Sequence, residues 1–316
     1  MKRLLLLFFI CLFLCSCSDK RYSTQIFGYF DTVVSVDGYF ENEKEFEKAC
    51  AIIENTLSDY HNALDIHSKN GEAAILNSRK SLTVSTMLLD AIHFGIKVNE
   101  VTFGNCNIAM GAVLEEWHKA RENGVLPDFE VLEDKAKYTN IENIEISGNT
   151  VTLLDENMSL DFGAIAKGYV ADLLKESLKG YNMIINLGGN VLVLGDKDGS
   201  GWKVGVQDPE NENALSKTLT IKDTSLVTSG VYQRYFEYEG KRYHHIISPD
   251  TLYPSDNYLS VTVLYESSAW ADALSTALFN MSIEEGKEIL ENFDDIGVMW
   301  IKNDGNIEYY GNIKDV

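Results

Sequence analysis

Three short segments carry side chains that could do chemistry together. The first, LDFGAIAKGYVADLL at residues 160–174, contains Asp161, Gly163, Lys167 and Gly168 and runs into an apolar helical pattern. Glycines let a backbone approach a ligand closely, and the free amides at a helix start favour an anion. The spacing matches neither the G-x-x-x-x-G-K-[ST] loop nor G-x-G-x-x-G. Taken alone, the segment therefore fits an ordinary structural turn at least as well as a phosphate site.

The second segment, SSAWADALSTALFNM at residues 267–281, places oxygen ligands on one helix face. Asp272 and Thr276 are four residues apart, and Ser275 lies beside them. Mg²⁺ prefers oxygen ligands and commonly takes one or two carboxylates together with phosphate and water. In the structural alternative, Asp272 compensates the helix dipole and Thr276 is satisfied locally.

The third segment, TSGVYQRYFEYEGKRYHHIISP at residues 228–249, predicts a hairpin that ends in two histidines. Its strands are expected at 232–237 and 241–247, with His244 and His245 near the end. Neighbouring strand residues point to opposite faces, so at most one histidine faces a given site. That histidine could move a proton or bind a phosphate.

The elements that must position these segments are a mixture of helices and strands. Apolar periodicity predicts helices at 44–60, 86–99, 109–121, 164–178 and 269–281. Strands are predicted at 32–36, 183–187, 191–194, 202–206, 216–221, 232–239, 260–265, 298–302 and 307–310. The polar stretch 123–149 reads as a connection with short strands. Because no regular βαβ alternation appears, we expect an α+β fold, a single domain with mixed or antiparallel sheets and packed helices.

The N-terminal residues have the features of a bacterial lipoprotein signal. Lys2 and Arg3 precede an apolar run at 4–14, which is too short to span a bilayer. The run ends in Leu-Cys-Ser-Cys, which resembles a lipobox and predicts cleavage before Cys17 and lipidation of its thiol. A plain secretory signal is the alternative. The predicted organisation is a signal peptide at 1–16, a lipidated tether at 17–24 and a folded domain at 25–316.

Composition limits the partners. The chain has 316 residues and a formal net charge of −21, so we expect no nucleic acid partner. An anionic ligand would need local positive charge, which a divalent cation could provide. After processing, Cys50 and Cys106 would remain besides Cys17, and we expect both to be buried apolar residues rather than a bridge.

Together, and in this order, the segments resemble the ApbE family of FAD:protein FMN transferases. The family pattern D-x-x-[GA]-x-[AG]-[KE]-G-Y-x-x-D is met by Asp161, Ala164, Ala166, Lys167, Gly168, Tyr169 and Asp172. N-x-G-G-[DN] is met by Asn186, Gly188, Gly189 and Asn190, and T-S-G-x-Y-x-R-[YF] by Thr228, Ser229, Gly230, Tyr232, Arg234 and Tyr235. H-I-[IL]-[DS]-P begins at His245, S-V-T-V at Ser260 and A-D-A-L-[AS]-T-A at Ala271.

The resemblance implies a reaction in which FAD and a Ser or Thr hydroxyl of a partner protein give phosphoester-linked FMN and AMP, with Mg²⁺. The implied metal ligands are the backbone carbonyl of Ala164 and the side chains of Asp272, Ser275 and Thr276. The implied FAD contacts are Phe30, Asn105, Cys106, Asn107, Asp161, Lys167 and Ile246. His245 and Asp272 are the implied catalytic residues.

The resemblance also implies a partner and a place. The flavin-accepting protein is expected to be a subunit of a membrane electron-transfer complex, and the chain a lipid-anchored protein on the extracytoplasmic face of the cell membrane. Departures from the family pattern fall in the FAD contacts of the N-terminal third, where Cys106 and Asn107 stand in place of Phe and Asp. The metal set matches.

Three other functions are alternatives to the transferase, and the first of them uses the same residues. One is a Mg²⁺-dependent FAD pyrophosphatase, in which water replaces the protein acceptor. The second is a flavin-binding lipoprotein without enzymatic activity, and the third is a lipoprotein binding module without flavin affinity. The pyrophosphatase would give FMN only in free form, and a binding protein would keep its function without Asp272.

Overall fold

The computed structural model describes residues 19–197, 199–314 and 316, and an antiparallel sheet of eight strands forms its centre. The strand order is β1-β2-β6-β7-β10-β13-β14-β15, and every pairing is antiparallel. These strands are β1 Lys20–Tyr29, β2 Thr32–Phe40, β6 Asn182–Leu187, β7 Asn190–Leu194, β10 Ser225–Gly230, β13 Tyr258–Tyr265, β14 Gly297–Lys302 and β15 Ile307–Gly311.

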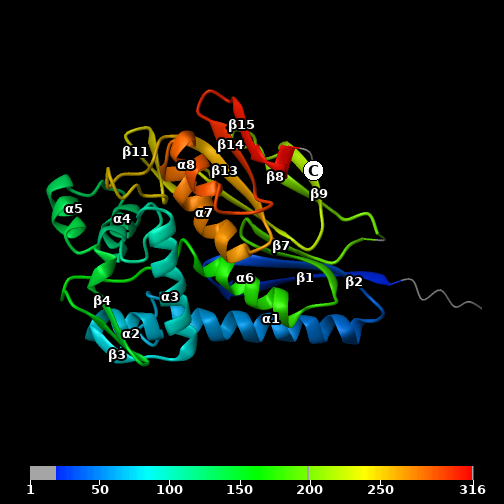
Figure 1. The fold of residues 1–316 in the computed structure, drawn as a ribbon, viewed down its shortest axis with the longest axis horizontal. Helices are drawn as coiled ribbons and strands as arrows, with labels where there is room; N and C mark the ends of the chain where they lie inside the picture. Colours follow the sequence, from blue (N-terminus) through cyan, green and yellow to red (C-terminus); the bar gives the residue numbers. More distant parts are fainter. Residues whose placement is uncertain (1–18, 198, 315) are drawn as a thin grey trace, which may run out of the picture.

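Helices cover one face of this sheet, and a strand pair covers the other. The helices against the sheet are α1 Glu43–Leu64, α6 Ala166–Ser177 and α7 Ser268–Asn280 (Figure 1). The pair β8 Trp202–Gln207 and β9 Leu215–Ile221 packs on the opposite face. Strand alternation explains the two layers: Val263 faces the helices, whereas its neighbour Leu264 faces Trp202 and the strand pair.

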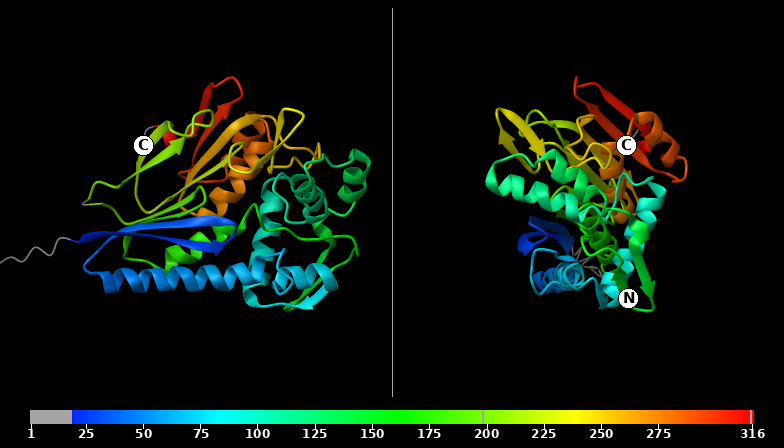
Figure 2. Two further views of the ribbon diagram at one scale, coloured as in Figure 1. Left: turned by 180° about the vertical axis from the view of Figure 1, so that it is seen from behind. Right: turned by 90° about the vertical axis from the view of Figure 1, so that its left-hand side faces the viewer.

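Smaller elements gather at one end of the molecule, as both Figure 1 and Figure 2 show. They are α2 Glu72–Arg79, α3 Thr86–Val101, α4 Gly111–Asn123, α5 Phe129–Ala136 and the sheet β3-β5-β4. The strands of that sheet are β3 Ser81–Thr83, β4 Ile144–Ser147 and β5 Thr150–Leu153. The hairpin β11 Tyr235–Tyr238 with β12 Lys241–His244 and the helix α8 Ile283–Leu290 complete the fold.

The predicted α+β class, as one unit of helices and antiparallel sheets, is confirmed. All five predicted helices are present as α1, α3, α4, α6 and α7, and each predicted strand has a counterpart. The predicted strand at 232–239 is shorter, because residues 231–234 form a turn before β11 begins at Tyr235.

Three short helices were not predicted, nor were the strands β1, β3, β5 and β10. The stretch 123–149 contains the helix α5 as well as a strand, and α2 and α8 are also of only eight residues each. The α8 start carried a readable signal, since Ser282 and Glu285 form a capping box. Strand β1 begins at Lys20, inside the segment predicted as a tether; as an edge strand it is largely polar, which hid it.

The predicted signal peptide and lipidation at Cys17 lie outside the described residues. Within the described residues, no helix is long and apolar enough to cross a membrane. Cys106 is buried in the core and Cys50 is half-buried, and both are free thiols, as expected for residues that form no bridge.

Candidate active site

The centre of the candidate site is the junction where α6 meets α7. The Gly168 amide in the first turn of α6 donates a hydrogen bond of 2.8 Å to Asp272 Oδ2 on α7. A Cβ at Gly168 would lie 2.4 Å from both the Asp272 Cβ and the Ser268 carbonyl oxygen. Glycine at this position therefore permits close helix packing. That packing brings the segment with Lys167 against the predicted metal-binding face of α7.

This hydrogen bond also changes what the Ala164 carbonyl can do. In a continuous helix the Gly168 amide would donate to the carbonyl of Ala164, four residues earlier. Here that amide is bound to Asp272, and among the described residues no other donor reaches the Ala164 carbonyl oxygen. Ala164 is partly exposed, so its carbonyl oxygen is available to a ligand.

Asp272 is a buried carboxyl group. It is 5% exposed, and burial raises its pKa, with Lys167, the Gly168 amide and the neighbouring Asn190 side chain acting in the opposite direction. The Asn190 amide nitrogen is buried near the Asp272 carboxylate but makes no well-formed hydrogen bond among the described residues. A buried carboxylate next to a free carbonyl oxygen is a donor set that suits a hard cation.

Thr276 and Ser275 differ in their surroundings. Thr276 is partly exposed on the same face as Asp272, one turn further along α7. Ser275 is fully buried: its hydroxyl donates to the Asp272 carbonyl at 2.9 Å and pairs with the Ser229 hydroxyl of β10 at 2.8 Å. The structure therefore places Thr276 where a ligand can reach it, while Ser275 connects α7 to the sheet.

The two histidines have separate roles, as the alternation argument predicted. His244 is buried: its Nε2–H donates to the Ser255 carbonyl at 2.8 Å and its Nδ1 accepts from the Ile246 amide at 3.3 Å. Both ring nitrogens are thus satisfied in the neutral form, and burial lowers the pKa of His244.

His245 is exposed to solvent at the end of the hairpin. Neighbouring protein atoms, followed by the charges of Lys167 and Arg234, lower its pKa. Its Nδ1 lies 3.3 Å from the Arg234 carbonyl oxygen, which can only accept, so Nδ1 carries the proton. This tautomer leaves Nε2 unprotonated. Lys167 acts electrostatically on both His245 and Asp272, and therefore lies near both predicted catalytic residues.

The predicted FAD contacts differ in how exposed they are and in how many of their polar groups are already hydrogen-bonded. Asp161 is buried before α6, where its Oδ1 accepts from the Gly163 amide at 2.7 Å, and Lys167 is partly exposed. Ile246 is buried, and both of its backbone groups are bonded, to His244 and Ser255.

The segment Asn105–Asn107 is held by local contacts. Cys106 is 2% exposed and burial raises its pKa to about 12, so its thiol belongs to the core. The Asn107 side chain bonds the Thr139 carbonyl and the Ala109 amide, and the Asn105 carbonyl accepts from Asn280. Asn105 and Asn107 are thus partly exposed, but both already make hydrogen bonds within the protein.

Phe30 occupies the two-residue turn between β1 and β2. Its ring packs against His61 at 5.3 Å and borders the two largest hydrophobic clusters. The Arg234 guanidinium donates to the Phe30 carbonyl oxygen at 3.2 Å. Phe30 and His245 are therefore linked through one residue, although they are far apart in the sequence.

Sequence reasoning assigned no role to Asp172 or Arg234. Asp172 accepts hydrogen bonds from the Ser267 hydroxyl and from the Ser268 and Ala269 amides at the start of α7. Both residues lie in motifs that the chain shares with the ApbE family pattern, and this membership was the sequence signal that could have identified them. Their partners lie about 95 and 204 positions away, so local spacing could not identify them.

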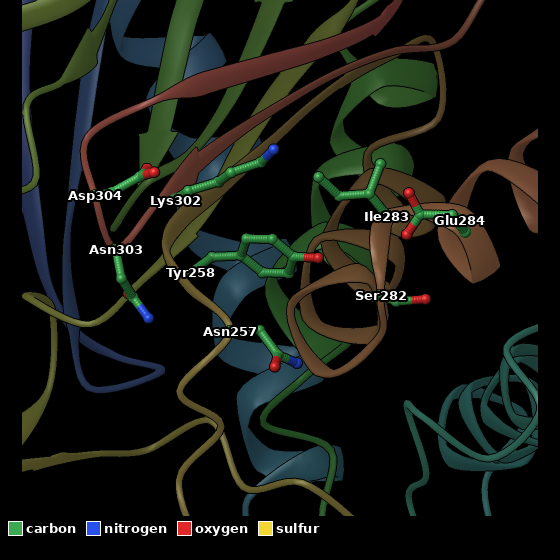
Figure 3. Close-up of a pocket in the computed structure, with 8 residues that line it drawn as sticks. All are labelled: Asn257, Tyr258, Ser282, Ile283, Glu284, Lys302, Asn303 and Asp304. Atoms are coloured by element: carbon green, nitrogen blue, oxygen red, sulfur yellow. The ribbon is translucent and has the colours of Figure 1, made fainter.

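A surface hollow of about 520 Å³ lies apart from this site (Figure 3). Its lining comes from the start of β13, the start of α8 and the β14–β15 turn: Asn257, Tyr258, Ser282, Ile283, Glu284, Lys302, Asn303 and Asp304. It contains none of the predicted site residues. Several of its polar groups are engaged locally, such as the Tyr258 hydroxyl that donates to the Met281 carbonyl at 2.9 Å. We therefore place the chemistry at the α6–α7 junction.

In the described part of the chain, no cluster of three or more His, Cys, Asp or Glu side chains could hold a metal ion. A cation at the junction would therefore depend on one carboxylate with backbone and hydroxyl oxygens. This is the kind of ligand set that Mg²⁺ accepts, and it differs from that of a typical zinc site.

In the comparison with protein families, the model of the ApbE family matches residues 30–300. The FAD:protein FMN transferase of Klebsiella pneumoniae is 33% identical over 261 residues, which are 79% of this chain and 81% of that protein. The FAD:protein FMN transferase of Treponema pallidum is 30% identical over 271 residues, with 79% and 73% covered.

Solved structures give the same picture. The ApbE protein of Thermotoga maritima superimposes with a TM-score of 0.83 at 27% identity, covering 92% of this chain and 96% of that one. The flavin transferase ApbE of Vibrio cholerae superimposes with a TM-score of 0.79 at 26% identity, with 93% and 98% covered.

Proposed function

This chain belongs to the ApbE family, and from that membership and the geometry of the α6–α7 junction we propose how it acts. It is a transferase that moves FMN from FAD to a protein. Our proposal adds the bond that is formed, the metal ion and the roles of individual residues.

In the proposed reaction, a Ser or Thr hydroxyl oxygen of the acceptor protein attacks the phosphorus on the FMN side of the FAD pyrophosphate. A phosphoester bond forms, the bond to the bridging oxygen breaks, and AMP leaves with the electron pair. The hydroxyl proton passes to a base of the enzyme and from there to the AMP phosphate. No oxidant or reductant is consumed. The nucleophile comes from the partner, so the chain needs no serine nucleophile of its own.

The residues at the junction fit a Mg²⁺ ion. The free Ala164 carbonyl, the buried Asp272 carboxylate and the accessible Thr276 hydroxyl would hold it. When bound, Mg²⁺ polarises the phosphate under attack and neutralises the charge that develops on the leaving group. Ser275 stabilises this ligand set indirectly, because its hydroxyl donates a hydrogen bond to the backbone carbonyl of Asp272.

His245 is the proposed proton acceptor. Its Nδ1–H is directed to the Arg234 carbonyl, so the unprotonated Nε2 is the ring atom that would accept the proton of the attacking hydroxyl. Lys167, which lies near His245 and Asp272, would bind a phosphate oxygen, and Asp161 would accept a hydrogen bond from FAD. Positioning and charge neutralisation supply most of the catalysis in such transfers.

The observation that carries this proposal is the Gly168–Asp272 hydrogen bond, which leaves the Ala164 carbonyl open beside a buried carboxylate. The test is incubation of the purified chain with FAD, Mg²⁺ and a flavin-accepting subunit of a membrane electron-transfer complex. We expect covalent FMN on the acceptor by mass spectrometry, one AMP per FMN, and loss of both with EDTA or Asp272→Ala. FMN found only in free solution would instead identify a pyrophosphatase.

We also propose that the chain works on the extracytoplasmic face of the cell membrane, anchored through a lipid on Cys17. Strand β1 begins at Lys20, three residues after Cys17, so the anchored domain would lie within roughly 10 Å of its lipid. The supporting observation is the signal pattern before Cys17. Fractionation of cells with Cys17→Ser should move the protein from the membrane to the soluble fraction; an unchanged distribution would refute the anchor.

A further inference from the structure

The turn between β1 and β2 is held in an unfavourable backbone conformation. Tyr29 pairs with Thr32, so Phe30 and Asp31 form a two-residue hairpin turn, and both have positive φ values of 51° and 50°. Turns of this kind normally use Asn-Gly, because positive φ is costly for residues with a Cβ. A non-glycine pair persists in this conformation only where its surroundings hold it, and such strain often marks a functional position.

One arginine side chain holds this turn. Arg234 Nη2 donates to the Phe30 carbonyl oxygen at 3.2 Å and to the Asp31 carbonyl oxygen at 2.9 Å. A charged donor that bridges the two successive carbonyls restrains both peptide planes of the turn. The His61 ring, 5.3 Å from the Phe30 ring, supports the side chain on the other side.

The backbone of the same arginine holds His245. The Arg234 carbonyl oxygen accepts from the His245 amide at 3.2 Å and lies 3.3 Å from His245 Nδ1. Arg234 thus restrains the Phe30 turn with its side chain and the tautomer of His245 with its carbonyl oxygen. Its guanidinium also lies close enough to His245 to act on it electrostatically.

We infer that Arg234 is a positioning residue. It fixes the Phe30–Asp31 turn as one wall of the FAD site and keeps that wall in a fixed position relative to His245. The inference rests on the proposed function only in taking FAD as the ligand of this site. Arg234 itself does not contact the reacting atoms. It acts through Phe30, which the family resemblance places among the FAD contacts.

The first test measures FAD affinity by quenching of flavin fluorescence, without an acceptor protein. Arg234→Met should raise the Kd for FAD about tenfold, and Phe30→Ala should have a similar effect. The double variant should bind no more weakly than either single variant, because both changes remove the same wall. Arg242→Met is the matched control: Arg242 is on the same hairpin but contacts Glu237 and Tyr235 instead of the turn.

The second test relieves the strain directly. Asp31→Gly places a residue that tolerates positive φ at the second turn position, so it should restore most of the FAD affinity lost in Arg234→Met. Arg234→Lys, which keeps a cationic donor, should retain more affinity than Arg234→Met, and it replaces that variant in the cycle if Arg234→Met does not fold. A general structural defect would not be corrected by a glycine in the turn.

Two results would overturn the inference. One is an Arg234→Met variant that binds FAD as well as Arg242→Met does. The other is full additivity of Arg234→Met and Phe30→Ala without rescue by Asp31→Gly, which would mean that the two residues act independently. These binding results are separate from the transfer reaction, so a wild-type chain that binds FAD but labels no acceptor refutes the proposed function and leaves this test interpretable.

Discussion

Asp172 and Asp272 each bind the first turn of the other's helix. The Asp172 carboxylate on α6 accepts hydrogen bonds from the Ser268 and Ala269 amides at the start of α7, at 2.6 and 3.2 Å. The Asp272 carboxylate on α7 accepts one from the Gly168 amide in the first turn of α6, at 2.8 Å. Both carboxylates complement the positive ends of helix dipoles. Only Asp272 lies beside an open carbonyl oxygen, so we expect their functions to differ.

The first prediction separates these two carboxylates. Asp172→Asn should lower the free energy of unfolding by about 1–2 kcal/mol, because it weakens a cap with three donors. The variant should keep most of its transfer activity. Asp272→Asn should lower Mg²⁺-dependent transfer by at least about 100-fold, since it removes the anionic ligand. Urea denaturation and the rate of acceptor labelling measure the two effects.

Each of the two variants is the control for the other, because one should affect mainly stability and the other mainly transfer. Among the described residues, Asp272 accepts from the Gly168 amide alone, whereas Asp172 accepts from three donors, so Asp272→Asn should cost less stability than Asp172→Asn does. If Asp172→Asn abolished transfer while the protein stayed folded, the assignment of Asp172 as a purely structural residue would be wrong.

The second prediction concerns the close approach of α6 and α7. Gly168→Ala adds a methyl group that would meet the Asp272 Cβ and the Ser268 carbonyl oxygen at 2.4 Å. We expect a loss of about 1–3 kcal/mol in the free energy of unfolding and a strong loss of transfer, because the helices must separate. Glu176→Ala, at an exposed position of the same helix, is the control and should change neither. A stable, active Gly168→Ala variant would show that the junction is more adaptable than its geometry indicates.

The long helices could be predicted from the sequence because their apolar positions repeat with the helical period. In α1, for example, Phe46, Ala49, Ile53 and Leu57 are all buried. The short helices α2 and α5 could not, because eight residues contain only about two turns of that pattern. Strand β1 was missed because its exposed edge position removes the apolar alternation that identifies strands.

Some residues of the candidate site could likewise be paired from the sequence, and others could not. Asp272 and Thr276 could be paired from the sequence because four residues on a helix correspond to one face. Nothing in local spacing could place Ser275 against Ser229, or Arg234 against Phe30, because those contacts depend on how strands and helices pack. The role of Gly168 is a further example: it reads as part of a phosphate loop, and its helix-packing role requires the position of α7.

The third prediction uses the neutral state of His244. Burial lowers the pKa of His244 in the folded protein. Protonation would also place a second N–H on Nδ1, against the Ile246 amide from which it now accepts a hydrogen bond. In the unfolded chain the ring protonates near pH 6.5, so the folded state loses stability as the pH falls below that value, by up to about 1.4 kcal/mol per pH unit.

Urea unfolding at pH 7.5 and pH 5.5 checks this expectation. His244→Gln, which keeps a donor toward the Ser255 carbonyl but does not titrate, should lose less stability on acidification than the wild type. Some pH dependence will remain in the variant, because the pKa of His245 is also lowered. An equal slope in both proteins would mean that His244 is protonated in the folded state.

The last prediction distinguishes the two hydroxyl groups predicted as metal ligands. Thr276 is partly exposed beside Asp272, whereas the Ser275 hydroxyl is buried and already bonded to the Asp272 carbonyl and to Ser229. Thr276→Val keeps the shape of the side chain and removes its oxygen, so it should raise the Mg²⁺ concentration for half-maximal transfer about tenfold.

Ser275→Ala should leave that concentration nearly unchanged and should instead cost about 1–2 kcal/mol of stability, because the Ser229 hydroxyl loses its buried partner. Ser229→Ala, which breaks the same pair from the strand side, should destabilise the protein similarly without altering its Mg²⁺ dependence. If Ser275→Ala shifted the Mg²⁺ dependence as far as Thr276→Val does, Ser275 would be a ligand and its bond to Ser229 would have to open when the metal binds.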